Sequence, residues 1–222
     1  MSLIVELIGP SGVGKTHLVN RLRDAGRLQG WQSIREASAL LESETPAPDM
    51  CGEYFQLKML EEQISWFKAN CPQHEVDLFM PVHEAYIRAD ILIEKSTRDF
   101  KILADEHLFH IFCGQVLNLA VNQREVLQRT LRNRAFIFVF DTAENILKNT
   151  RLRQQAGVWR PRMGGVGDDQ LRERTEWYFS YMNQMAGMIA AENGRQIHLD
   201  LAGDESKLDS TVVNFLQALS SA

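Results

Sequence analysis

A short segment near the start of the chain combines three glycines, a lysine and a threonine at fixed spacing. Residues Gly9 to Thr16 read GPSGVGKT, and a short apolar run, LIVELI, precedes them. Without a Cβ at Gly9, Gly12 and Gly14, successive backbone N–H groups can point inward at an anion. A helix that begins near Lys15 adds the positive end of its dipole at the same point. The segment therefore predicts a loop that holds phosphate groups.

The complete pattern, G-x-x-x-x-G-K-[ST], indicates that the phosphates belong to a nucleoside triphosphate. Lys15 supplies a mobile cation for the outer phosphates, and the hydroxyl of Thr16 can ligate Mg²⁺. We expect ATP rather than GTP, because the sequence lacks an Asn-Lys-x-Asp guanine-reading tetrapeptide. The residues expected to contact ATP are Gly9, Ser11, Gly12, Val13, Gly14, Lys15, Thr16 and His17.

A second chemical signal is the pair of acids that ends the segment KILADE. An apolar strand that ends in Asp105 can bring a carboxylate beside the loop, where it holds Mg²⁺ directly or through water. Glu106 can add to that site, act as a general base or orient an acceptor. The alternative interpretation is a strand that simply ends in two solvated acids.

These residues need a scaffold, and the hydrophobic pattern predicts one in which strands alternate with helices. Parallel strands with helices on both faces follow from that order, as an α/β fold of about five strands. The segment RAFIFVFD has the continuous apolar pattern of a strand that is covered on both faces. We expect a single domain over residues 1–222. The expected strands are 3–8, 31–37, 100–106, 134–141 and 195–201, and the expected helices are 16–29, 51–70, 82–98, 108–132, 143–156, 168–193 and 205–220.

Composition restricts the class of protein. A net charge of -5 argues against a nucleic-acid-binding protein, which usually needs a basic surface. The three cysteines have no CxxC spacing, which is typical of a reduced cytoplasmic protein rather than of a disulfide framework. No segment approaches the ~20 apolar residues of a membrane span. The short apolar start, which contains Glu6, does not resemble a signal peptide.

The order of elements, together with GPSGVGKT, resembles the P-loop nucleoside and nucleotide kinases, in particular the thymidylate kinase and deoxynucleoside kinase branch. The resemblance spans nearly the whole chain, and the first motif is its specific part. It implies the three-layer P-loop NTPase fold and an ATP- and Mg²⁺-dependent kinase. In this branch the second strand ends in an acid that is often preceded by arginine. At that point of the segment SIREAS stand Arg35 and Glu36, so the resemblance implies that Glu36 lies across from the triphosphate, near the acceptor.

The resemblance also implies a mobile lid that carries arginines, at about residues 151–168. Phosphoryl transfer places negative charge between donor and acceptor, and a flexible segment can bring guanidinium groups to it once both are bound. Closure also excludes water. The expected catalytic residues of the chain are Lys15, Glu36, Glu106, Arg151, Arg153 and Arg160.

Two departures from the family pattern leave the acceptor open. Ala37-Ser38 replaces the Pro-Gly-Gly that follows Arg-Glu in thymidylate kinases, and Asp105-Glu106-His107 replaces the family endings of the third strand. The acceptor is therefore a nucleoside, a nucleotide or another small molecule such as a sugar or an antibiotic, and a homodimer is left open. The alternative function is a P-loop ATPase that acts as a switch or motor component, with water as acceptor.

Three further groups of residues receive structural interpretations. His107 and His110 can share one helical face, but without a third ligand they predict no metal site. Helical spacing of five aromatic residues indicates core packing, although some can line an acceptor pocket. These are Trp66, Phe67, Trp177, Tyr178 and Tyr181. We expect a run of four arginines to be solvated on a helix: Arg124, Arg129, Arg132 and Arg134.

Overall fold

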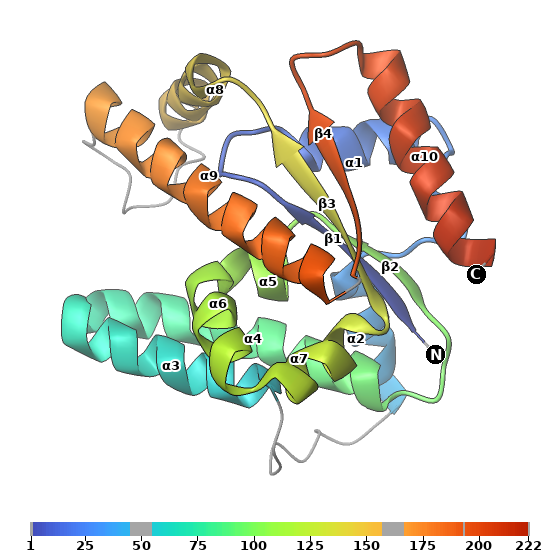
Figure 1. The fold of residues 1–222 in the computed structure, drawn as a ribbon, viewed down its shortest axis with the longest axis horizontal. Coiled ribbons are helices and arrows are strands. Elements are labelled where there is room, and N and C mark those ends of the chain that lie inside the picture. The colour runs from blue at the N-terminus through green and yellow to red at the C-terminus, as the bar shows by residue number, and fades with distance from the viewer. Residues whose placement is uncertain (1, 45–54, 157–166, 193, 222) are drawn as a thin grey trace.

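The structure, a computed structural model, describes residues 2–44, 55–156, 167–192 and 194–221 (Figure 1). Its four strands pair in the order β2-β1-β3-β4, and every neighbouring pair is parallel. The carboxyl ends of all strands therefore meet at one edge of the sheet, which is where sites form in open α/β folds. The strands are β1 (Leu3–Ile8), β2 (Lys101–Ala104), β3 (Arg134–Phe140) and β4 (Arg195–Asp200).

Helices cover both faces of this sheet, which confirms the expected three-layer α/β fold. On one face, α1 (Lys15–Asp24) and α10 (Glu205–Ser221) pack against β1, β3 and β4 (Figure 1). The opposite face is covered by α3 (Phe55–Asn70), α4 (Gln73–Lys95), α5 (Leu108–Ile111), α6 (Cys113–Asn122), α7 (Arg124–Leu131) and α9 (Asp168–Ala191).

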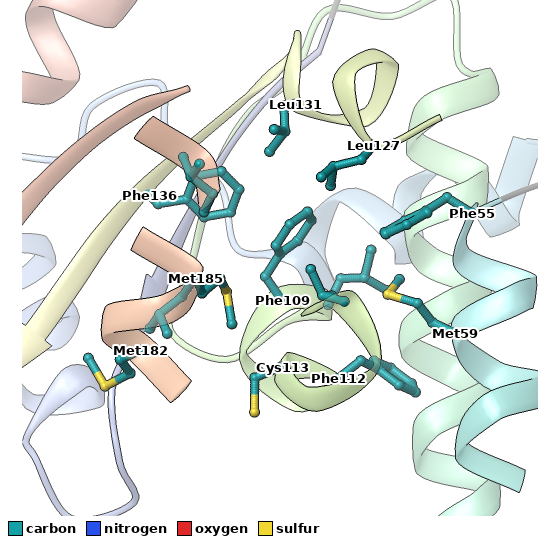
Figure 2. Close-up of a cluster of buried hydrophobic side chains, with 14 of the residues drawn as sticks. Phe55, Met59, Phe109, Phe112, Cys113, Leu127, Leu131, Phe136, Met182 and Met185 are labelled. Atoms are coloured by element: carbon teal, nitrogen blue, oxygen red, sulfur yellow. The ribbon is translucent and has the colours of Figure 1, made fainter. Parts of the chain in front are cut away.

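The alternating residues of β3 show why this strand is apolar almost throughout. Phe136 and Phe138 belong to the cluster formed with α5, α6 and α9. Figure 2 shows Phe136 in this cluster with Phe109 and Met185. The intervening residues belong to the cluster on the α1 and α10 side. A strand buried on both faces has no solvent-facing position to fill with polar residues, as the sequence predicted.

The expected strand at 31–37 is wrong, and with it the expected count of five strands. Only Gln32 pairs with β2: its N–H donates to the Lys101 carbonyl at 2.8 Å, and its carbonyl accepts from Leu103 at 2.9 Å. The chain then enters α2 (Ile34–Glu44). Ser33 and Glu36 bond reciprocally as a capping box, at 3.2 Å from Glu36 N–H to Ser33 Oγ and 2.7 Å from Ser33 N–H to Glu36. This local helix start ends the strand after one residue.

The remaining expected elements are present, with shifted boundaries. Helix α4 begins at Gln73 rather than near residue 82 and continues through Pro81. The expected helix over 108–132 is divided into α5, α6 and α7. Helix α8 (Ala143–Gln155) includes residues 151–155 of the expected lid, and residues 157–166 lie outside the described residues. No helix in the described ranges combines the length and apolar character that crossing a membrane requires.

Candidate functional site

The phosphate-binding pattern forms the connection between β1 and α1, at the carboxyl edge of the sheet. Gly12 and Gly14 have φ angles of 90° and 105°, in the left-handed region that favours glycine. At Gly12 a Cβ would also lie 2.7 Å from Thr150 Oγ1. Both glycines are therefore required by the loop's shape, a backbone conformation of the kind that can present N–H groups to an anion.

Lys15 is buried at the start of α1, with its ammonium group folded over the loop. Its Nζ donates to the carbonyl oxygen of Gly9 at 2.6 Å and to that of Pro10 at 3.3 Å. The charge of a buried ammonium is stabilised best by an anion. Held this way, Lys15 lies where phosphate oxygens would enter the loop and can exchange its carbonyl partners for them.

Thr16 and Asp105 lie in contact although 89 positions separate them in the chain. The Thr16 hydroxyl donates to Asp105 Oδ2 at 2.7 Å. The parallel pairing of β1 with β2 produces this contact, because it places the end of β2 beside the start of α1. A hydroxyl and a carboxylate are oxygen ligands of the kind Mg²⁺ takes, so the residues present fit that ion. Within the described parts of the chain, no three His, Cys, Asp or Glu side chains converge as a metal site.

Two cavities flank the loop. We call the first the His17 cavity; it has a volume of about 410 Å³ and extends from the loop between α8 and the start of α10. Its lining mixes apolar and charged side chains. The loop contributes Gly12, Val13 and Gly14, and α1 contributes His17. Helix α8 contributes Asn149, Leu152 and Arg153, while Leu201 follows β4 and Glu205 and Leu208 come from α10.

The second, the Trp177 cavity, has a volume of about 710 Å³ and touches the loop at Pro10 and Ser11. Its walls come from α3, α5, α8 and α9. Exposed aromatic residues dominate it: Trp66 is 49% exposed and Trp177 is 56% exposed. The expectation that these two tryptophans are core residues is wrong, whereas Phe67 is buried as expected. The other lining residues used below are Cys71, His110, Arg174 and Tyr178.

Helix α8 separates the two cavities and is attached to the loop. Asn149 Nδ2 donates to the Gly12 carbonyl at 3.0 Å. The next residue, Thr150, lines the Trp177 cavity, while Asn149 lines the His17 cavity. A ligand in either cavity therefore contacts the same loop and the same helix from opposite sides. No pattern in the sequence pointed to Asn149.

The arginines expected in the lid have different positions. Arg153 lines the His17 cavity. Arg151 points elsewhere: its Nε donates to Asp168 at the start of α9 at 2.8 Å, and its Nη1 donates to Gln154 at 2.6 Å. Arg160 lies outside the described residues. The structure thus brings Arg153, and not Arg151, to the lining of the His17 cavity.

Glu36 is not brought to the loop. Its carboxylate accepts the hydrogen bonds from Ser33, which lower its pKa, and lies 3.9 Å from Arg23 Nη2. Arg23 belongs to the last turn of α1, eight residues after Lys15. At 1.5 Å per residue, that turn is about 12 Å from the phosphate loop. The position of Glu36 is thus set by the helix that replaced the expected second strand.

Glu106, in contrast, lies beside Asp105 and faces a histidine. His110 Nε2 is 3.7 Å from Glu106 Oε1, and His110 Nδ1 is 2.6 Å from the hydroxyl of Tyr178. The backbone N–H of His110 donates to the buried carboxyl group of Glu6 at 2.6 Å. His110 and Tyr178 both line the Trp177 cavity, whereas Glu106 does not.

Arg134 is buried rather than solvated, contrary to the expectation for the arginine run. Its Nη2 donates to Asp90 Oδ2 at 2.6 Å, and His107 Nε2 lies 2.7 Å from Asp90 Oδ1. Burial would raise the pKa of Asp90, but the Arg134 charge and the His107 contact outweigh it and hold that pKa well below its usual range. In the sequence, the signal for this cluster is a single acid inside the apolar run of α4 and a single arginine opening β3.

The comparisons with known proteins concern the fold. No protein-family model matches the sequence, and no curated protein matches it significantly. Deoxyadenosine kinase from M. mycoides with bound dATP superposes with a TM-score of 0.50 at 13% identity, covering 97% of this chain and 100% of that chain. The same kinase with bound dCTP gives a TM-score of 0.50 at 11% identity, with the same coverage. The resemblance to the P-loop nucleoside kinases is therefore confirmed as a likeness of fold.

Proposed function

We propose that this chain is a kinase that transfers the terminal phosphoryl group of ATP to a small acceptor, with Mg²⁺ as cofactor. The observation that carries the proposal is the pair of cavities that meet at one phosphate loop. A transfer reaction needs one binding site for the donor and a separate binding site for the acceptor. An ATPase needs no second cavity of about 710 Å³ beside the loop, because its acceptor is water.

In this proposal ATP occupies the loop and the His17 cavity. Loop N–H groups and Lys15 hold the outer phosphates, and the start of α1 adds its dipole to theirs. The nucleoside extends between the apolar side chains of Leu152 and Leu208, beside Arg153. A deoxyadenosine kinase of similar fold was solved with bound dATP, which supports a nucleotide as the kind of ligand.

Thr16 and Asp105 are the residues that would hold Mg²⁺, since their oxygens lie 2.7 Å apart beside the loop. There the ion would neutralise part of the negative charge on the phosphate groups. The chain's own residues position the reactants. Pro10 and Ser11 place the mouth of the Trp177 cavity at the loop, where an acceptor hydroxyl can approach the terminal phosphate.

The acceptor in this proposal is a small molecule with an apolar or planar body. The half-exposed rings of Trp66 and Trp177 offer flat apolar surfaces, and Arg174 adds a cation to the same wall. Nucleosides, nucleoside monophosphates and sugars with apolar faces all meet this description. The experiment below identifies which of these classes is the acceptor.

The test measures ADP release from ATP and Mg²⁺ with a panel of nucleosides, nucleoside monophosphates, sugars and aminoglycosides, beside a control without acceptor. A rise confined to one acceptor class supports the kinase and identifies its substrate class. Equal and appreciable release in every well contradicts the kinase and favours the ATPase alternative, in which Glu106 beside Asp105 would activate water.

A further inference from the structure

The Trp177 cavity raises a question about the proton of the acceptor. An acceptor hydroxyl must lose its proton as its oxygen attacks phosphorus, and a nearby base normally receives it. Among the described residues that line this cavity, none is an aspartate or a glutamate. The two carboxylates expected for this role are not in this lining: Glu36 pairs with Arg23, and Glu106 Oε1 lies 3.7 Å from His110 Nε2.

The ionisable side chains in the described lining are Cys71, His110, Arg174 and Tyr178. Arginine does not release its proton in proteins, so Arg174 is not a base. Burial raises the pKa of Tyr178 well above its ordinary value, which keeps its phenol neutral. An imidazole is the side chain whose ordinary pKa lets it take up a proton near neutral pH. Among these lining residues, His110 is therefore the candidate base.

The surroundings of His110 fix both ends of its ring. Tyr178 Oη lies 2.6 Å from Nδ1, a short hydrogen bond, and Glu106 Oε1 lies 3.7 Å from Nε2, within ion-pair range. The backbone is fixed as well, since its N–H donates to Glu6. A carboxylate, an imidazole and a hydroxyl in sequence form the arrangement by which a histidine draws a proton from a hydroxyl while the acid stabilises the imidazolium.

We propose that Tyr178 and His110 form a relay that removes the proton of the acceptor hydroxyl, an inference that rests on the proposed kinase function. The acceptor proton passes to Tyr178 Oη as the phenol's own proton passes to His110 Nδ1. The acceptor oxygen forms its bond to the terminal phosphorus, and the bond from that phosphorus to the oxygen of the ADP leaving group breaks. The leaving oxygen keeps the electron pair.

Glu106 is a positioning residue in this relay. It holds the charge that develops on His110, which later returns its proton to solvent. Tyr178 gains and loses one proton in the same step, so its phenol stays neutral throughout, consistent with its raised pKa. The relay thus links the acceptor cavity to the acids at the end of β2 without requiring a carboxylate in the cavity wall.

The experiment compares His110→Asn and Tyr178→Phe with the wild-type enzyme, using ATP, Mg²⁺ and the acceptor class that raises ADP release in the panel. Asparagine keeps a polar atom near the Nδ1 position and can bond Tyr178, but it cannot take up a proton. We expect kcat to fall about 100-fold in His110→Asn and about tenfold in Tyr178→Phe, with the KM for ATP unchanged. His74→Asn, exposed on α4, and Tyr181→Phe, on the same helix as Tyr178, are the matched controls.

The outcomes separate this relay from the proposed function. If the wild-type enzyme releases ADP at the same rate with and without every acceptor, both the proposed kinase function and the relay are wrong. If acceptor-dependent release survives in both variants, or if only a KM changes, the relay is wrong and the kinase stands. Circular dichroism melting checks that each variant is folded, and should His110→Asn be unfolded, Tyr178→Phe, which removes one oxygen atom, decides the question.

Discussion

The two cavities beside the phosphate loop differ in how they are built. The His17 cavity is formed by the loop itself, by α8 and by the segment that follows β4, all of which meet at the carboxyl edge of the sheet. The Trp177 cavity has only Pro10 and Ser11 from the loop, and the rest of its described lining comes from α3, α5, α8 and α9 and from Cys71, which follows α3. The first is therefore a consequence of the α/β scaffold, whereas the second depends on how helices pack above it.

This difference suggests which parts of the site any such scaffold supplies and which are particular to this chain. A phosphate-binding site at the loop requires only a strand, a glycine-rich turn and the start of a helix. The tryptophans, His110 and Tyr178 come from elements far apart in the sequence, and their side chains give the second cavity its chemistry. This comparison of the two cavities can be tested with variants that change one cavity, both cavities or neither of them.

Lys15 belongs to the loop that both cavities touch, so its loss should have the largest effect. In Lys15→Ala the terminal phosphate loses the cation that stabilises it at the point of transfer. We expect turnover to fall at least about 1,000-fold, measured as acceptor-dependent ADP release, with the fold retained. Lys101→Ala, at the amino end of β2, should leave turnover unchanged. Wild-type turnover in Lys15→Ala would show that the loop is not the phosphate site.

Asp90 lines neither cavity, so its variant should separate stability from catalysis. Asp90→Asn leaves the buried Arg134 charge without its ionised partner and should lower the free energy of unfolding by about 3 kcal/mol. Because the folded-state pKa of Asp90 is depressed, its stabilisation is present above the unfolded pKa and is lost as the pH falls.

The difference in stability between wild type and Asp90→Asn should therefore narrow below about pH 4, as followed by urea denaturation. The exposed Asp77, on the same helix, provides the control, since Asp77→Asn should change the free energy of unfolding by less than about 0.5 kcal/mol. An Asp90→Asn protein as stable as wild type would mean that the Arg134 pair contributes nothing to the fold.

Trp177→Ala should act on the acceptor alone. The variant removes a half-exposed ring from the wall of the second cavity, so the KM for the acceptor should rise about tenfold. The KM for ATP should stay within twofold of wild type, as initial rates at varied ATP would show. Leu78→Ala removes an equally exposed apolar side chain outside both cavities and should change neither KM. If Trp177→Ala raised only the KM for ATP, the Trp177 cavity would be the donor site and the His17 cavity the acceptor site.

Arg153→Ala should have the opposite selectivity and a smaller effect: it should weaken the binding of ATP and leave the binding of the acceptor unchanged. Arg153 is exposed in the wall of the His17 cavity, where solvent weakens its attraction to phosphate. We expect the KM for ATP to rise about fivefold and the KM for the acceptor to remain unchanged. Arg129→Ala, exposed on α7, is the matched control. If Arg153→Ala raised the KM for the acceptor instead, the lining of the first cavity would not describe the donor site.

Much of the fold and half of the site were predictable because the signals are local. The motif from Gly9 to Thr16 prescribes a turn between a strand and a helix, and the apolar run of β3 prescribes a strand covered on both faces. Asp105 was placed beside the loop because parallel strands end at a common edge. The contact of Thr16 with Asp105 is a direct result of that rule.

The missed features are those in which a local signal competed with a distant one. The segment SIREAS reads both as a strand end and as a capping box, and the capping box, which satisfies N–H groups at a helix start, determines the structure. Arg134 reads as the last member of a basic run, yet it faces Asp90 across 44 positions of the chain. Nothing near either residue in the sequence specifies that pairing.

The sequence by itself therefore determined the glycine-rich loop from Gly9 to Thr16, the α/β scaffold and the edge of the sheet at which the candidate site lies. Backbone geometry and hydrophobic spacing act over a few residues, so they can be interpreted without knowledge of the rest of the chain. Only the tertiary structure decided that Glu36 lies away from the loop, that two tryptophans face a cavity, and that Tyr178 meets His110 across 68 positions. Those contacts depend on how whole helices pack on the sheet, which many distant side chains determine together.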